Sequence, residues 1–239
     1  RPDIILATDP DSDRIAAAIP VGGGFRKLSG NEMGCLLLDY ILRNLRKNGT
    51  LPEKPVAVKS IVSTPLAERI AAALGCEMRT VLTGFKYIGG VILELEEQGC
   101  PERFVLGFEE SCGYLKGDYA RDKDAVVTAM LIAEMAASYK LEGRTLGDVM
   151  DGLYDEYGHF ATGLQNVQFT SDAQKEHCMA LMEALRRQPP EAVAGFPVTA
   201  VTDFRAGVET VRESGAQRPT GLPQENMVML TLGAQGRVI

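Results

Sequence analysis

The first two-thirds of the chain alternates short apolar runs with amphipathic segments, and this order constrains the fold most strongly. The runs VAVKSIV (56–62), EMRTVLT (77–83) and RFVLGF (103–108) have the length and composition of buried strands. Between them, residues 64–74 and 87–99 have helical periodicity. Strands that alternate with helices form largely parallel sheets covered by helices. The sequence therefore predicts an α/β fold with mixed, mostly parallel sheets and helices on both faces.

The segments before this alternation predict a strand, a hairpin and a helix. Residues 3–8 (DIILAT) form an apolar run typical of a buried strand, and the segments around VGGG (21–24) predict a hairpin. Residues 31–47 have helical periodicity and end on a basic turn before Asn48-Gly49. Such a glycine is a common signal for the end of a helix.

The character of the chain changes beyond His159. Before it, Asp122 is expected to cap a helix that runs to about Tyr139, and residues 145–158 (TLGDVMDGLYDEYG) are expected to form another. After His159 there is one amphipathic helix (172–187), followed by strands that proline and glycine punctuate. These features predict a smaller α+β domain at the end of the chain.

Composition argues against several classes of function. The 25 basic and 32 acidic residues give a formal net charge of −7, which does not suit a general binder of nucleic acid or anionic membranes. No segment reaches the roughly 20 apolar residues that a membrane-spanning helix needs. The five cysteines form no C-x-x-C pair, which predicts reduced thiols in a cytoplasmic protein.

An acidic loop follows the first apolar run. In TDPDSDR (8–14), Asp9, Asp11 and Asp13 occupy every second position, so in an extended chain they point the same way. Three close carboxylates repel one another unless a cation neutralises them. Mg²⁺ is the cation that suits this loop best, because it prefers carboxylate and phosphate oxygens as ligands. The adjacent Arg14 either neutralises the carboxylates or grips phosphate oxygens.

Two other kinds of acidic loop have a similar pattern of aspartates. An EF-hand loop that starts at Asp9 needs glycine and glutamate where the chain has Arg14 and Pro20, so this reading fails. A haloacid-dehalogenase-type phosphatase also places D-x-D after its first strand. Its later acidic motif is imitated by GDYARD (117–122), although here ESCGYLK precedes that motif and not a buried strand. This phosphatase remains the alternative interpretation.

A second polar constellation lies in residues 105–126. Glu109, Glu110 and Ser111 follow an apolar strand, and Gly107 and Gly113 bracket them. Carboxylate and hydroxyl groups at the end of a strand suit the recognition of sugar hydroxyls. A surface loop would have the same composition, so this motif alone leaves both interpretations open.

The two constellations together resemble the α-D-phosphohexomutase superfamily, the phosphoglucomutase/phosphomannomutase enzymes. TDPDSDR resembles the metal loop of that family, and GFEES-x-G (107–113) resembles its sugar loop. TGFKYIG (83–89) and RDKDAV (121–126) resemble substrate-contacting segments, and LSGNEMGCLLLDYIL (28–42) resembles the usual continuation after the metal loop. The resemblance covers essentially the whole chain.

This resemblance implies a metal site. Asp9, Asp11 and Asp13 would ligate Mg²⁺, whose remaining protein ligand in the family is a phosphoserine. Arg14 would contact that phosphoserine. The serine loop, of the type T-A-S-H-N-P, is absent from the sequence, and so is the phosphate loop of the type R-P-S-G-T-E-P. We therefore expect the 239-residue chain to lack mutase activity by itself.

The resemblance also implies a substrate site for a hexose phosphate. Glu109 and Ser111 would bind the sugar hydroxyls, and Lys123 would lie near the transferred phosphate as a charge stabiliser or proton acceptor. Weaker candidates for the substrate-facing turn are Thr83, Gly84 and Lys86. The enzyme would be an isomerase that transfers a phosphoryl group between the 1- and 6-positions. GFEES favours phosphoglucomutase over phosphomannomutase, and a phosphopentomutase or a non-catalytic sugar-phosphate-binding module remains open.

The same resemblance implies three domain segments. Residues 1–52 would be the C-terminal part of domain two with the metal loop. Residues 53–158 would be domain three with the sugar loop, and residues 159–239 part of domain four.

Overall fold

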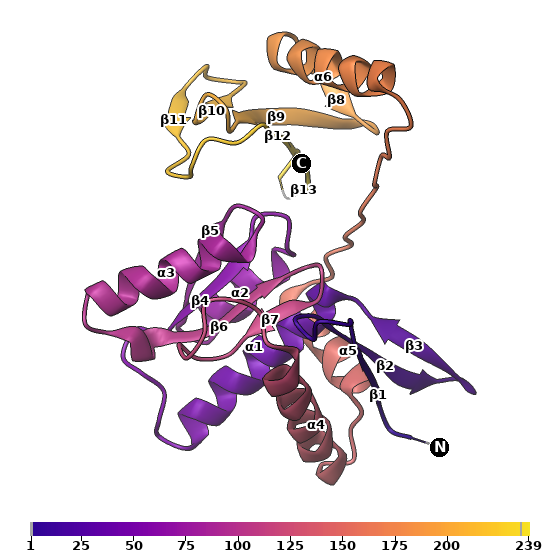
Figure 1. Ribbon diagram of the computed structural model, residues 1–239, viewed down its shortest axis with the longest axis vertical. Helices are drawn as coiled ribbons and strands as arrows, with labels where there is room; N and C mark the ends of the chain where they lie inside the picture. The colour runs from indigo at the N-terminus through magenta and orange to yellow at the C-terminus, as the bar shows by residue number, and fades with distance from the viewer. Residues whose placement is uncertain (1, 235) are drawn as a thin grey trace. The chain divides into compact units, whose positions relative to one another are not determined.

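The computed structural model describes residues 2–234 and 236–239, and the chain divides into two compact units (Figure 1). The first unit ends at Thr162, and the second extends from Gly163 to Ile239. No helix in the described part of the chain is long and apolar enough to cross a membrane.

The first unit begins with a three-stranded antiparallel sheet of β1 (Ile5–Thr8), β2 (Ile15–Val21) and β3 (Gly24–Leu28). The predicted hairpin is present: β2 and β3 are joined at Gly22 and Gly23, whose φ angles of 53° and 100° favour glycine. The prediction of a buried strand at residues 3–8 is wrong. Most of β1 is exposed, because among the described strands it pairs only with β2 and forms an edge of this sheet.

The first helix, α1 (Gly30–Lys47), follows directly. Ser29 accepts a hydrogen bond from the Glu32 backbone, and the Glu32 side chain accepts one from the Ser29 N–H, which completes a capping box. Basic residues occupy the last turn, where they interact favourably with the helix dipole. One long stretch of α1 is buried, so this helix is the central helix of the unit.

A four-stranded sheet with the order β5-β4-β6-β7 forms the centre of the unit. Three strands are parallel: β4 (Val56–Ser60), β5 (Glu77–Val81) and β6 (Phe104–Glu109). The short β7 (Gly113–Leu115) pairs antiparallel with β6. The prediction of a mixed, mostly parallel sheet is confirmed. The three parallel strands therefore end at the same edge, and the loops that follow them meet there.

Helices cover both faces of this sheet, as predicted. Ala57, Leu106 and Phe108 pack in one apolar cluster with α1 and α2 (Leu66–Ala73). Val56 and Val58 pack in a second cluster with α3 (Phe85–Glu97). The remaining elements of the unit are the 3-10 turn η1 (Pro101–Arg103) before β6, and the helices α4 (Ala125–Leu141) and α5 (Leu146–Tyr157), both of which join the first cluster.

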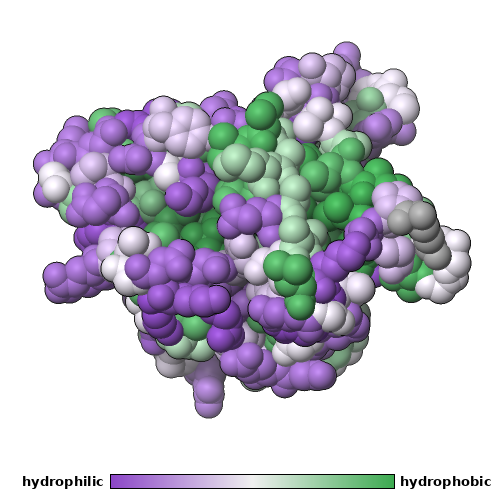
Figure 2. Space-filling view, turned by 90° about the horizontal axis from the view of Figure 1, so that it is seen from below, coloured by the Kyte–Doolittle hydropathy of each residue, from purple (hydrophilic) through white to green (hydrophobic). Residues whose placement is uncertain are grey.

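The helix α4 carries apolar residues on its outer side as well as its inner side. Ala125, Ile132 and Met135 are buried, but Val126 and Met130 are 68% and 60% exposed. Figure 2 shows exposed apolar residues lying among polar ones on the surface that it draws. Unlike an amphipathic helix, α4 therefore has no sharp division between a core side and a solvent side.

The second unit is the predicted α+β domain. Its antiparallel sheet has the order β11-β10-β9-β12-β13, and β8 pairs with β9. The apolar side chains Met182 and Leu185 of α6 pack against Val198, Leu230 and neighbouring residues of this sheet. The elements are α6 (Asp172–Arg187), β8 (Ala192–Val193), β9 (Phe196–Asp203), β10 (Val208–Val211), β11 (Gln217–Pro219), β12 (Val228–Leu232) and β13 (Gly236–Val238).

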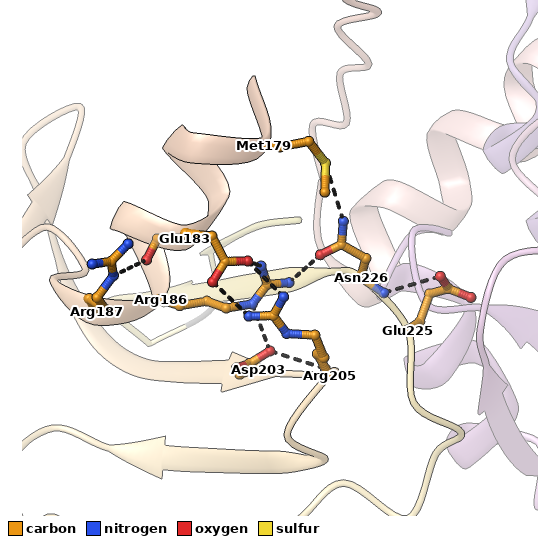
Figure 3. A network of polar contacts seen from close by, with 8 residues as sticks. All are labelled: Met179, Glu183, Arg186, Arg187, Asp203, Arg205, Glu225 and Asn226. Carbon is orange, nitrogen blue, oxygen red and sulfur yellow. Dashed lines mark hydrogen bonds and ion pairs between the residues drawn. The ribbon is translucent and has the colours of Figure 1, made fainter. Parts of the chain in front are cut away.

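A polar network joins α6 to the sheet of the second unit (Figure 3). The nearly buried Arg186 donates to Asp203 Oδ1 at 3.1 Å and to Asn226 Oδ1 at 2.6 Å. Glu183 accepts two hydrogen bonds from the Arg205 guanidinium, at 2.6 and 2.8 Å. Hydrogen-bonded pairs of a guanidinium and a carboxylate have a defined geometry, so they hold the helix at a defined position on the sheet.

Candidate active site

The acidic loop between β1 and β2 brings its three aspartates together. One carboxylate oxygen each of Asp9, Asp11 and Asp13 lies within 4.8 Å of the others. The predicted convergence is present, but its predicted cause is wrong, because the loop is a turn and not an extended strand. Ser12 has a φ of 58°, and its N–H donates to the Asp9 carbonyl at 3.1 Å. The loop also joins antiparallel strands, and does not lie at the end of a parallel strand.

Arg14 fixes one side of this loop. Its backbone N–H donates to Asp9 Oδ1 at 3.1 Å, and its Nε donates to Asp9 Oδ2 at 2.9 Å. The backbone hydrogen bond, helped by the guanidinium, lowers the pKa of Asp9 to about 2. The Arg14 side chain is 53% exposed, and its two terminal nitrogens make no hydrogen bond to the described residues. They are therefore available to an anionic ligand.

The sugar loop connects β6 to β7, at the edge where the parallel strands end. Glu109 is 5% exposed, and its Oε1 accepts a hydrogen bond from the Gly84 N–H at 2.7 Å. Burial raises the pKa of Glu109, and the hydrogen bond from Gly84 only partly offsets this effect. Ser111, two residues further on, is exposed.

Lys123 reaches from the segment after β7 to the acidic loop. Its Nζ lies 3.1 Å from Asp13 Oδ2 and 2.8 Å from Asp122 Oδ1. Partial burial alone would lower its pKa, but the hydrogen bonds to these two carboxylates raise it. The stem of Lys123 passes over Gly113, where a Cβ atom would come within 2.2 Å of Lys123 Cδ. Gly113 therefore leaves the space that Lys123 occupies.

Backbone hydrogen bonds hold the acidic loop beside these segments. The Ile15 N–H donates to the Cys112 carbonyl at 3.0 Å, directly after an isolated bridge between Arg14 and Gly113. The Ala125 N–H donates to the Ser12 carbonyl at 3.1 Å. Parts of the chain that are distant in sequence thus form one surface.

A cavity of about 780 Å³ opens on this surface. Asp11, Asp13, Lys86 and Lys123 contribute charged side chains to its wall. The wall is completed by Ser12, Gly89, Gly90, Leu93, Ala120, Arg121, Asp122 and Asp124. Cations and carboxylates around one cavity suit a ligand that carries both phosphate and hydroxyl groups.

Comparison with known proteins assigns the chain to a family. Residues 29–157, more than half of the chain, match the family profile described as "Phosphoglucomutase/phosphomannomutase, alpha/beta/alpha domain III". The chain belongs to the phosphoglucomutase/phosphomannomutase family. The resemblance inferred from the sequence motifs is thereby confirmed.

Individual relatives agree with this family assignment. A phosphoglucomutase of Staphylococcus haemolyticus is 34% identical over 229 residues, which are 95% of this chain and 40% of that protein. A phosphoglucomutase of Staphylococcus epidermidis is 32% identical over 229 residues, 95% of this chain and 41% of that protein. The chain thus spans about 40% of the length of these relatives.

A solved structure also shares the fold. The open form of parafusin, a phosphoglucomutase of Paramecium, has a TM-score of 0.61 with 18% identity. The similarity covers 99% of this chain and 37% of that one. It extends over both compact units.

The acidic loop of this family member fits a hard divalent cation. Its donors are all carboxylate oxygens, which Mg²⁺ prefers. Asp13 Oδ1 is buried and has no hydrogen-bond partner among the described residues, although the Arg14 Nε lies 3.5 Å away. A buried carboxylate oxygen without a hydrogen bond is costly unless a cation is its partner. The residues present are therefore suited to Mg²⁺.

The other predicted site residues differ in how closely they approach the cavity. Lys86 and Lys123 line it, whereas Gly84 and Glu109, which are hydrogen-bonded to each other, are not part of its wall. Thr83 and Ser111 are exposed and are not part of the cavity wall. Asp9 and Arg14 also lie outside the wall, so the cavity groups Asp11, Asp13, Lys86 and Lys123 among the residues that the motifs indicated.

Asp122 and Gly113 have roles that differ from those expected from the sequence. Asp122 does not cap α4; its carboxylate accepts hydrogen bonds from the Lys123 N–H and Nζ, and Asp124 accepts the capping bond from Val127 N. Gly113 was noted only as the end of a tight loop, although it makes room for Lys123. The adjacent charges of RDKDAV were the available signal for Asp122, but they do not show which aspartate reaches the lysine.

Proposed function

We propose that the chain carries the metal loop and the sugar loop of a phosphohexomutase, most closely a phosphoglucomutase. Such an enzyme moves a phosphoryl group between the 1- and 6-positions of a hexose. The observation that carries the proposal is that the acidic loop and Lys123 line one cavity in a chain of this family, and that a backbone hydrogen bond joins the acidic-loop side to the sugar loop at Cys112. We expect no mutase activity from the chain alone, because its sequence contains no T-A-S-H-N-P-like serine loop.

Positive charges on the acidic-loop side suit the phosphate. Mg²⁺ held by Asp9, Asp11 and Asp13 would neutralise charge on phosphate oxygens when bound. The terminal nitrogens of Arg14, which bond to none of the described residues, form a fork that matches two phosphate oxygens. Lys123, held between Asp13 and Asp122, adds a compact positive charge at the cavity wall. We infer that Lys123 acts as the charge stabiliser.

The sugar-loop side suits hydroxyl groups. Glu109 Oε1 is fixed by Gly84, while its Oε2 has no hydrogen-bond partner among the described residues. That oxygen can accept from a sugar hydroxyl, and the exposed Ser111 hydroxyl can donate or accept. Because these groups hydrogen-bond to sugar hydroxyls and not to phosphates, they suit a sugar phosphate that binds with either its 1-position or its 6-position towards the acidic loop.

Titration of Mg²⁺ into the purified chain tests the metal site. We expect binding by calorimetry, and a loss of at least tenfold in affinity for Asp11→Ala and Asp13→Ala, since each removes one charged ligand. Asp151→Ala, an exposed carboxylate on α5, is the matched control and is expected to bind as the original chain does. Equal affinity in all variants would refute the metal assignment.

Titration with sugar phosphates tests the substrate class. Amide NMR shifts of Ser111 and Lys123 are expected to move when glucose 1-phosphate is added with Mg²⁺. Mannose 1-phosphate and ribose 5-phosphate serve as competing substrates that decide the sugar. If none of the three moves these signals, the proposed substrate class is wrong. Catalysis is then tested separately, by assaying interconversion of glucose 1-phosphate and glucose 6-phosphate.

A further inference from the structure

A buried pair of serine hydroxyls lies behind the sugar loop. Ser60 is the last residue of β4 and Ser63 follows in the next loop, and both are 0% exposed. The two Oγ atoms are 2.7 Å apart, and Ser60 Oγ lies 2.8 Å from Glu110 Oε2. Glu110 is the residue between Glu109 and Ser111, to which no role has been assigned so far.

The donors in this chain of hydroxyls follow from the number of protons. An ionised carboxylate only accepts hydrogen bonds, and a serine hydroxyl has one proton to donate. Ser60 therefore donates to Glu110, and Ser63 donates to Ser60. All the hydrogen bonds point towards the sugar loop, and the one that ends on Glu110 is charge-assisted and hence among the stronger kinds.

The backbone of Glu110 is held from another side. A Cβ atom on Gly30, at the start of α1, would lie 2.1 Å from the Glu110 carbonyl oxygen and 2.7 Å from its carbonyl carbon. The first turn of α1 thus contacts the turn of the sugar loop directly. With its side chain bonded to Ser60 and its backbone against Gly30, Glu110 has little freedom to move.

The topology explains why these groups meet. In the strand order β5-β4-β6, the chain passes from β4 to β5 on one side and then returns to β6 on the other side of β4. Ligand sites of parallel sheets lie outside the carboxyl ends of the strands at such a reversal. Ser60 ends β4 and Glu110 follows β6, so their hydrogen bond spans this point.

We propose that Ser60 is a positioning residue for the sugar loop, and that Glu110 is its anchor and not a sugar ligand. Through Glu110, Ser60 sets the places of Glu109 and Ser111 on either side. The inference about the sugar rests on the proposed function, whereas the anchoring of the loop can be measured without any sugar.

Amide hydrogen exchange by NMR measures the anchoring. Two amides report the position of the loop: Ile15, which donates to the Cys112 carbonyl, and Gly84, which donates to Glu109. We expect Ser60→Ala to accelerate exchange at both amides by about tenfold, the effect of losing one hydrogen bond to a charged group. Ser63→Ala leaves the bond to Glu110 in place, so its effect is expected to be smaller.

Controls separate anchoring from general destabilisation. The Cys76 amide, which donates to Ala71 at the end of α2, is expected to keep its exchange rate in Ser60→Ala. Ile70→Val, a buried substitution in α2, is expected to leave the two reporter amides unchanged. Ser60→Thr retains a hydroxyl and is expected to restore slow exchange.

A second pair of variants tests the same bond from the loop. Glu110→Ala removes the acceptor and is expected to accelerate exchange as Ser60→Ala does. Glu110→Gln keeps an acceptor oxygen and is expected to behave like the original chain. Unchanged exchange at Ile15 and Gly84 in both Ser60→Ala and Glu110→Ala would overturn the anchoring.

The consequence for binding is measured with glucose 1-phosphate. We expect Ser60→Ala to weaken its affinity by about tenfold with an unchanged Mg²⁺ affinity, since only the sugar loop is released. If the original chain binds the sugar phosphate and Ser60→Ala binds it equally well, the positioning role is wrong while the proposed function stands. If the original chain does not bind it, the proposed function fails, and the exchange experiment still decides the anchoring.

Discussion

The replacement of Gly30 by alanine tests the contact between α1 and the sugar loop most directly. A Cβ atom at this position would lie 2.1 Å from the Glu110 carbonyl oxygen and 2.8 Å from the Cys112 N. These are backbone atoms, which cannot rotate away as the end of a side chain can. Either α1 or the sugar loop must move by about 1 Å to restore an ordinary contact, and overpacking of this kind costs about 1–3 kcal/mol.

Gly90 in α3 provides the matched control. A Cβ atom there has no neighbour within 4 Å, and the residue belongs to a helix of the same unit, whose interior it occupies, whereas Gly30 is the first residue of α1. Alanine stabilises an unhindered helix position by about 0.5–1 kcal/mol relative to glycine. We therefore expect Gly90→Ala to raise the free energy of unfolding by about that amount. Gly30→Ala is expected to lower it by about 1–3 kcal/mol.

Tyrosine fluorescence makes this measurement specific to the first unit. All seven tyrosines lie at or before Tyr157, and the chain has no tryptophan. Urea unfolding followed by this signal thus reports the unit that contains both glycines. If Gly30→Ala proves as stable as Gly90→Ala, α1 does not pack tightly against the sugar loop. The inference that Gly30 restricts the backbone of Glu110 is then wrong.

Two further predictions concern single carboxylates. Asp124→Ala is expected to destabilise the first unit by about 1 kcal/mol, because the hydrogen bond that caps α4 at the Val127 N–H is lost. Asp122→Ala is expected to have a smaller effect. If urea unfolding shows the opposite order, Asp122 and not Asp124 caps the helix. Glu109→Gln keeps an acceptor for the Gly84 N–H and removes a buried charge. Because the folded-state pKa of Glu109 is raised, its ionisation weakens folding above that pKa, so the variant is expected to be more stable at pH 7. This advantage disappears as the pH falls to the ordinary value of 4.5, and an advantage independent of pH would contradict the reasoning.

Local patterns predicted the elements well where one physical rule dominates. The alternation of apolar strands and periodic helices led to the parallel sheet, because each element must bury its apolar side. The every-second spacing of the aspartates predicted the acidic cluster, although a turn at Ser12 and not an extended chain brings them together. The burial of β1 was overestimated, since composition does not show whether a strand has one neighbour or two.

The contacts that shape the site were beyond local patterns. Ser60 and Gly30 look ordinary in the sequence, and their roles depend on where Glu110 comes to lie in the folded chain. The two aspartates Asp122 and Asp124 differ only in register. One reaches Lys123 and the other caps the helix, because only a residue three positions before Val127 can cap it.

The hydrogen bond from Ile15 to Cys112 also has a consequence for the order of folding. It joins parts of the chain separated by about a hundred residues. The loss of chain entropy on closing such a long loop opposes the formation of this contact. The β1–β2 hairpin contains the acidic loop and the β6–β7 hairpin contains the sugar loop, but neither contains both. We therefore expect the two loops to lie side by side only in molecules in which both sheets have formed.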